Sequence, residues 1–72
     1  MITITEGNVE ASTSRQDRWV VCFDGVLSGS IDIIDGRAAT WTNRELSLEE
    51  LKNLVRVAER IEAGDTPTLE VR

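Results

Sequence analysis

Only one long stretch of this chain, residues 46–64, has hydrophobic residues recurring at spacings of three and four. At these spacings the side chains share one stripe of a helix, and such a stripe must pack against another layer. The stripe consists of Leu48, Leu51, Leu54, Val55, Ala58 and Ile61, with Val57 at its edge. The pattern therefore predicts one amphipathic helix over residues 47–63.

Both ends of this helix carry their own signals. Ser47 is a good N-cap residue, and Glu50 stands three positions later, as a capping box requires. At the other end, Gly64 suits the left-handed conformation that stops a helix, and Pro67 prevents easy resumption. The boundaries are thus predicted independently of the apolar stripe.

Before the helix, apolar and polar residues alternate as they do in half-buried strands. The alternation is interrupted at Gly7, which indicates either one long strand with a bulge or two short strands. Asp24-Gly25 and Asp35-Gly36 are strong signals for tight hairpin turns. The predicted strands lie near residues 2–12, 18–23, 26–34, 37–42 and 68–71.

These elements predict an α+β domain over residues 1–72. We expect an antiparallel meander of three to four strands, one C-terminal helix packed on one face, and a short final strand, in two layers. Gly29 is expected to mark a bulge or close packing of the helix. The residues expected on the helix-covered face are Trp19, Val21, Phe23, Leu27, Ile31 and Ile33.

The opposite face of the sheet would then combine threonine and serine with an apolar patch. A patch of this size on a small domain indicates a contact surface, of a dimer or of a complex with another partner. The alternatives are that the sheet curls over these residues or that they stand exposed singly. Trp41 is either core or an exposed aromatic anchor, and Cys22 is either an inert buried thiol or a reactive one, open to a disulfide across a dimer interface. The candidate dimer face is Val20, Cys22, Val26, Ile34 and Trp41.

Composition narrows the chemistry. The chain has no histidine, no tyrosine and one cysteine, which excludes the ordinary catalytic triads and the histidine or thiolate zinc sites. Its glycines do not form a phosphate-binding loop. A metal site built from Asp32, Asp35 and a third carboxylate is a weak alternative, because the turn already explains Asp35. We therefore expect no cofactor and no enzymatic activity.

Charge points to the kind of partner. The formal net charge is −5, which disfavours direct binding to nucleic acid and favours a basic protein surface. Lys52, Arg56 and Arg60 form a basic row on the helix, either a solvated face or a docking strip. The single cysteine favours a cytoplasmic location, and neither a signal peptide nor a membrane-spanning stretch is expected.

The resulting hypothesis is a small acidic protein-interaction module that inhibits a larger complex by docking on its basic, nucleic-acid-binding surface. In size and character the chain is similar to the small inhibitor proteins of phages and mobile elements, anti-CRISPR proteins among them, a likeness of class that no motif carries. The alternative is a homodimeric accessory protein paired through the outer sheet face. The residues expected to bind the partner are Glu6, Glu10, Asp17, Asp24, Asp32, Asp35 and Glu70.

Overall fold

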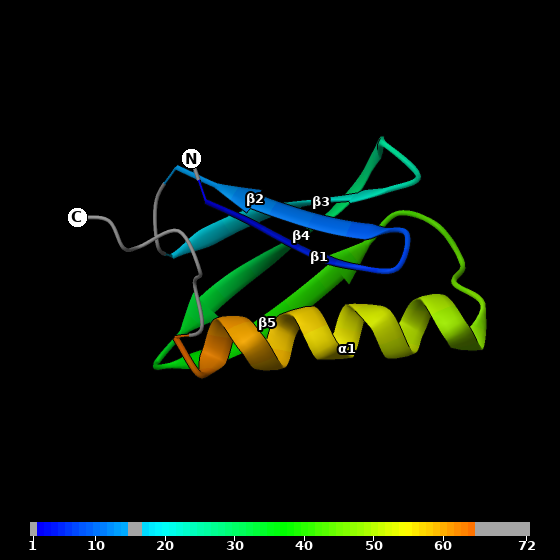
Figure 1. Cartoon of the computed structure of the whole chain (residues 1–72). Coiled ribbons are helices and arrows are strands. Elements are labelled where there is room, and N and C mark those ends of the chain that lie inside the picture. The colour runs from blue at the N-terminus through cyan, green and yellow to red at the C-terminus, as the bar shows by residue number, and fades with distance from the viewer. Residues whose placement is uncertain (1, 15–16, 65–72) are drawn as a thin grey trace.

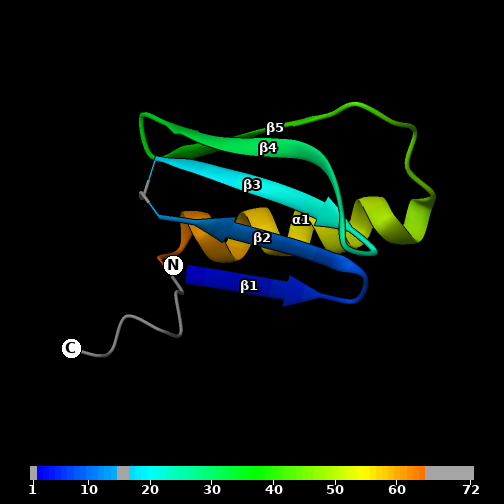
Figure 2. The ribbon, with the colours of Figure 1, turned by 90° about the horizontal axis from the view of Figure 1, so that it is seen from above.

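The computed structural model describes residues 2–14 and 17–64, and in them the alternating segments form one antiparallel sheet (Figure 1). Its strands follow one another in the order β1-β2-β3-β4-β5, with the helix α1 across one face (Figure 2). The elements are β1 (Ile2–Glu6), β2 (Val9–Thr13), β3 (Arg18–Phe23), β4 (Val26–Ile34), β5 (Arg37–Thr42) and α1 (Leu48–Glu62).

The predicted α+β class, meander and helix are confirmed, but three to four strands is too few. Residues 2–12 contribute two strands, β1 and the start of β2, because the chain reverses at Gly7-Asn8 and does not merely bend. Gly7 has φ +60°, which favours glycine at the first position of a two-residue hairpin turn. The strand predicted at 68–71 lies outside the described residues.

Both Asp-Gly turns form as predicted. Asp24 and Asp35 have φ of 54° and 53°, and the glycines that follow have φ of 80° and 79°. Two successive residues of positive φ define the type I′ turn, whose twist matches that of the strands it joins. These two aspartates therefore have a structural role in the turns.

The helix is capped as its sequence predicts. The Ser47 hydroxyl accepts a hydrogen bond from Glu50 N, and the Glu50 carboxylate accepts one from Ser47 N, each at 3.1 Å. Gly64 has φ +75° and donates its N–H to the Ile61 carbonyl at 3.0 Å. Both ends thus satisfy backbone groups that a helix leaves open.

The core fills the space between the sheet and α1. The helix lies nearest to β1, β2 and β5, so the sheet curves around it. Large side chains from β3 and β4 fill the middle of this curve: Trp19, Phe23 and Ile31 are each at most 2% exposed. The complete core is Ile4, Val9, Ala11, Trp19, Val21, Phe23, Ile31, Leu54, Val57 and Ile61.

The buried side of α1 differs from the predicted stripe. Val57 is fully buried and Asn53 is buried too, whereas Leu48, Leu51 and Val55 are 66%, 46% and 46% exposed. Two contacts with β1 and its turn hold this orientation. Arg60 pairs with Glu6 at 3.1 Å, and the Asn53 side chain packs directly over Gly7. The apolar stripe is broader than the sheet covers, and these polar contacts select its Val57 side.

A bulge in β4 shifts the register predicted for this strand. Val21 pairs with Gly29 but the next residue, Cys22, pairs with Leu27, so Ser28 is the extra residue. Ser28 is buried, and its hydroxyl donates to the Val26 carbonyl at 2.9 Å. Leu27 consequently leaves the helix-covered side on which the sequence pattern placed it.

Candidate functional surfaces

The predicted acidic residues do not form one cluster, and several have partners within the fold. Glu6 pairs with Arg60 at 3.1 Å and Asp32 pairs with Arg18 at 3.0 Å. Asp24 accepts a long hydrogen bond of 3.4 Å from the Asn8 amide. Glu10, Asp17 and Asp35 are exposed, and their side chains have no partner among the described residues. Glu70 lies outside the described residues.

An open groove of about 930 Å³ collects part of this set at one end of the outer sheet face. Asp17 and Asp32 line it together with Arg18, Val20 and Ile34. The Arg18 and Asp32 side chains of this pair are 72% and 37% exposed, so the pair contributes little stability and can be exchanged for another partner. Asp35 directly follows Ile34, and the Asp17 carbonyl accepts a hydrogen bond from Ile33 N at 3.0 Å, which holds Asp17 beside β4.

The outer face carries most of the predicted dimer residues, with one replacement. Val20, Ser30 and Trp41 lie on one line across β3, β4 and β5. The sequence allows Trp41 as either a core residue or an exposed aromatic anchor. Its side chain is 62% exposed, so the core position is wrong. Val26 is also wrong as an outer-face residue, because the bulge pairs it with Phe23 on the helix-covered side. Leu27, 62% exposed opposite Cys22, takes its place.

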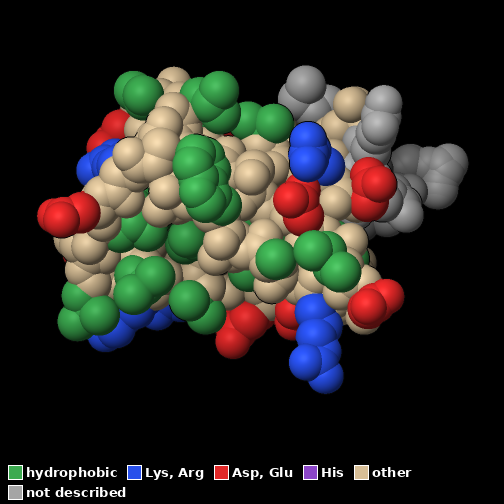
Figure 3. Space-filling view, turned by 180° about the vertical axis from the view of Figure 1, so that it is seen from behind, with side chains coloured by type: hydrophobic (Ala, Val, Ile, Leu, Met, Phe, Trp, Pro, Cys, Tyr) green, Lys and Arg blue, Asp and Glu red, His purple; other side chains and the backbone are tan. Residues whose placement is uncertain are grey.

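The apolar residues of this face are not continuous. Figure 3 shows hydrophobic side chains in separate groups, with acidic and basic side chains adjoining one another on the same face. The Arg18–Asp32 pair lies two residues from Val20 along β3 and two from Ile34 along β4. Cys22 is a free, half-buried thiol rather than the buried one that its apolar neighbours predicted.

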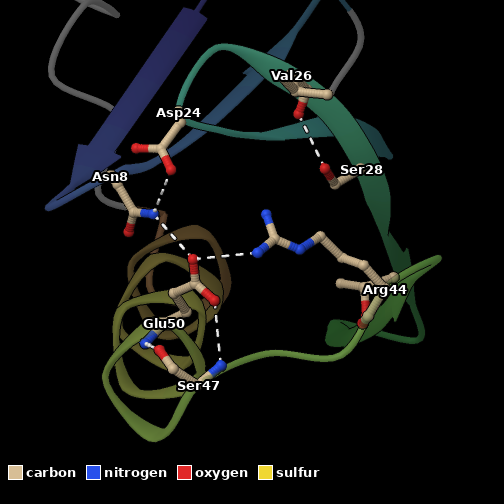
Figure 4. A network of polar contacts seen from close by, with 8 residues as sticks. Asn8, Asp24, Val26, Ser28, Arg44, Ser47 and Glu50 are labelled. Atoms are coloured by element: carbon tan, nitrogen blue, oxygen red, sulfur yellow. Dashed lines mark hydrogen bonds and ion pairs between the residues drawn. The ribbon is translucent and has the colours of Figure 1, made fainter.

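A polar network joins three segments at the opposite end of the sheet (Figure 4). The Asn8 amide donates to Glu50 at 3.1 Å, and Arg44 donates to the same carboxylate oxygen at 3.5 Å. The Arg44 guanidinium also lies over the Phe23 ring, 5.3 Å from its centroid. The network ties the β1–β2 turn to the start of α1. Sequence reasoning found Ser47 and Glu50 here but had no signal for Asn8 or Arg44.

The pKa of Glu50 is held below its ordinary value, chiefly by the hydrogen bond from Ser47 N. The hydrogen bond from the Asn8 amide and the positive charge of Arg44 lower this pKa further. The pKa is thus lower in the folded than in the unfolded chain. The stability this provides is complete above the ordinary glutamate pKa of about 4.3 and is lost as pH falls through the folded value.

Glu50→Gln is therefore expected to weaken the fold at neutral pH and to flatten the loss of stability on acidification. Urea unfolding from about pH 7 to about pH 2 measures both effects. Glu49→Gln is the matched control, because the Glu49 side chain is exposed and makes no hydrogen bond or ion pair among the described residues. Identical pH profiles for the wild type and Glu50→Gln would contradict the role of this network.

The predicted basic row on α1 is largely engaged within the fold. Arg60 pairs with Glu6, and Arg56 donates to the Asn53 side chain at 3.0 Å. Lys52 alone of the three makes no side-chain contact of this kind within the described part of the chain. A docking strip of three free cations is therefore not present on this helix.

Among residues 2–14 and 17–64, cysteine and carboxylate side chains do not form a group of three that could hold a metal ion. Within the same residues, α1 is too short and too polar to cross a membrane. Comparison with known protein families, curated proteins and solved structures finds no match for this chain.

Proposed function

We propose that this chain is a small acidic, non-enzymatic interaction module that inhibits a larger complex by docking on its basic, nucleic-acid-binding surface. The observation that carries the proposal is the groove at the Asp17 end, where carboxylates stand beside apolar side chains. A lysine or arginine of the partner would place its charge near Asp32 and Asp17 and its alkyl chain against Val20 and Ile34.

The surrounding charge supports the same partner. Asp17 lines the groove, and Asp35 directly follows the lining residue Ile34. Both carboxylates are exposed and have no partner among the described residues. The formal net charge of −5 would steer a basic surface toward the chain. In such a complex the partner's cation would displace Arg18 from Asp32, which costs little because that pair is exposed.

The function is tested by capture from a lysate of the native host at about 0.1 M and about 1 M salt, since the higher salt shortens the screening length to about 3 Å. We expect recovery of a nucleic-acid-handling complex at low salt and its loss at high salt. Recovery of the same complex at both salts, or of none, would count against the acidic inhibitor.

The groove is tested separately with Asp17→Asn/Asp35→Asn and the matched double variant Glu49→Gln/Glu59→Gln, which changes the net charge equally on the exposed side of α1. Binding of the captured partner, and of an arginine-rich peptide as a defined basic probe, is expected to weaken about tenfold for the first pair. Equal weakening by the two pairs would mean that net charge acts without the groove.

The second candidate is a homodimeric accessory protein paired through the outer sheet face. The exposure of Val20, Leu27, Ile34 and Trp41 favours self-association. Val20→Asp would then dissociate the dimer, which sedimentation would detect.

A further inference from the structure

Among residues 2–14 and 17–64, no strand pairs with the outer edge of β5. Ala38 N donates to the Glu62 carboxylate at 2.6 Å, which shows that the backbone of Ala38 points away from β4. Hydrogen bonding alternates along an antiparallel strand, so Thr40 and Thr42 also turn their backbone groups outward. β5 ends the sheet order, and no described strand pairs with these groups.

One flank of α1 faces this open edge. Arg60 reaches Glu6 on β1 whereas Glu62 reaches β5, and two helix positions differ by about 200° around the axis, so these side chains mark opposite flanks. Leu51, Val55 and Ala58 precede Glu62 at spacings of four, three and four, and therefore share its flank.

This flank has the spacing of a helix–helix seam. Leu48, Leu51, Val55 and Ala58 follow one another at intervals of three, four and three, the a/d pattern that packs one helix against another. Ala58 is half-buried, but Leu48, Leu51 and Val55 are 66%, 46% and 46% exposed. The lower left of Figure 3 shows hydrophobic side chains over the N-terminal half of α1, beside the sheet. The described fold thus leaves this seam without its second helix.

We propose that a second copy of this chain covers the open edge and the seam together. The two β5 strands pair antiparallel about a two-fold axis, so the sheet continues from one copy into the other. The two α1 helices then lie side by side on the same face, each presenting the same aliphatic row. A two-fold contact requires a surface complementary to itself, and an aliphatic row beside an unpaired strand edge meets that requirement.

The register follows from the groups that are free. Glu62 occupies the Ala38 N–H, so the free groups are those of Thr40 and Thr42, and pairing through these alone places Thr40 opposite Thr42 of the second copy. Trp41 then lies at the two-fold axis, opposite Trp41 of the second copy on the outer face. This aromatic pair covers an indole that is 62% exposed in the single chain.

This surface shares only Trp41 with the outer sheet face and is otherwise distinct from both surfaces discussed above. The groove lies at the Asp17 end of the outer face and needs no second copy. The outer-face dimer would bury the Arg18–Asp32 ion pair between apolar residues, which is unfavourable. The dimer through β5 and the seam would instead bury aliphatic side chains and backbone groups that hydrogen-bond to the second copy. Variants of the β5 edge and the seam therefore test a different hypothesis from variants of the groove.

The test is sedimentation velocity on the full chain from low micromolar to about 1 mM, with two interface variants. Leu51→Lys places charge in the seam at an exposed position, and Thr40→Pro removes the outward N–H of the strand edge. We expect a dimer in the wild type and a dissociation constant raised about 100-fold or more in each variant. Circular dichroism checks that each variant folds. If Thr40→Pro does not fold, Leu51→Lys alone decides the result.

Val26→Lys is the matched control, because Val26 is 63% exposed and lies beside the β3–β4 turn, on neither β5 nor α1. It should leave the dimer unchanged. A wild type that stays monomeric throughout overturns the proposal. The proposal is also overturned, in favour of the outer face, if Val20→Asp dissociates the dimer and Leu51→Lys leaves it intact.

Discussion

Replacing Gly29 with alanine is expected to lower the free energy of unfolding by about 3 kcal/mol. A β-carbon at this position would stand 2.1 Å from the carbonyl oxygen of Trp41 and 3.0 Å from the Cα of Thr42. Both are backbone atoms of β5, so no rotamer change relieves the overlap. The strand must move, which breaks the β4–β5 pairing next to the bulge.

Urea unfolding measures this effect, and Gly36→Ala is its control. Gly36 has φ +79° but open space around it, so alanine there is opposed by backbone conformation alone, at about 1 kcal/mol. Gly29 has no such conformational requirement, so the decrease in the free energy of unfolding of Gly29→Ala reports only the close approach of β5. If Gly36→Ala proved the more damaging of the two, the close approach would be wrong.

The second large effect is expected at Trp19. This side chain is 2% exposed in the centre of the core, and its removal in Trp19→Ala should cost about 3–5 kcal/mol. A domain of this size has a stability of about 4–11 kcal/mol, so a large fraction of the variant should be unfolded. Far-ultraviolet circular dichroism and urea unfolding measure the change.

Two variants separate volume from polarity at this position. The Trp19 indole nitrogen is buried without a hydrogen-bond partner in the described residues, which is itself unfavourable. Trp19→Phe keeps most of the ring volume and removes this N–H, so it should cost far less than alanine. Trp41→Ala, at a 62% exposed site, should change stability by less than about 0.5 kcal/mol when measured on dilute, monomeric protein. Equal losses from Trp19→Ala and Trp41→Ala would contradict this core.

The elements that local chemistry specifies could be predicted from the sequence. Asp24-Gly25 and Asp35-Gly36 determine their turns because positive φ is needed at two successive positions. Ser47 and Glu50 determine the start of α1 through their own hydrogen bonds. In each case the residues that carry the signal are also the residues that make the contact.

The features that depend on distant segments could not be predicted. Gly29 indicated a bulge or close packing of the helix, but not that Ser28 is the extra residue, which shifts the faces of β4, nor that Gly29 is required by β5. The rotation of α1 likewise depends on Asn53 over Gly7 and on Arg60 with Glu6, contacts between residues far apart in the sequence. Hydrophobic spacing alone gives a stripe wider than the buried surface.

The same limit applies to the candidate partner-binding residues. Composition shows that the chain is acidic but not which carboxylates are free. The fold engages Glu6 and Asp32 with arginines, while Asp17 and Asp35 have no partner in the described part of the chain. The sequence therefore indicated the sign of the surface charge, and the tertiary structure shows which carboxylates are available.

The strand order has a consequence for how the chain folds. Every strand pairs with its neighbour in sequence, so each hairpin closes a short loop at little entropic cost and can form within microseconds. The docking of α1 is different, because it joins Arg60 to Glu6 across 54 residues. We expect this step to limit the folding rate. During synthesis the apolar face of the sheet stays uncovered until α1 has emerged from the ribosome, and that interval is when the nascent chain is most exposed to aggregation.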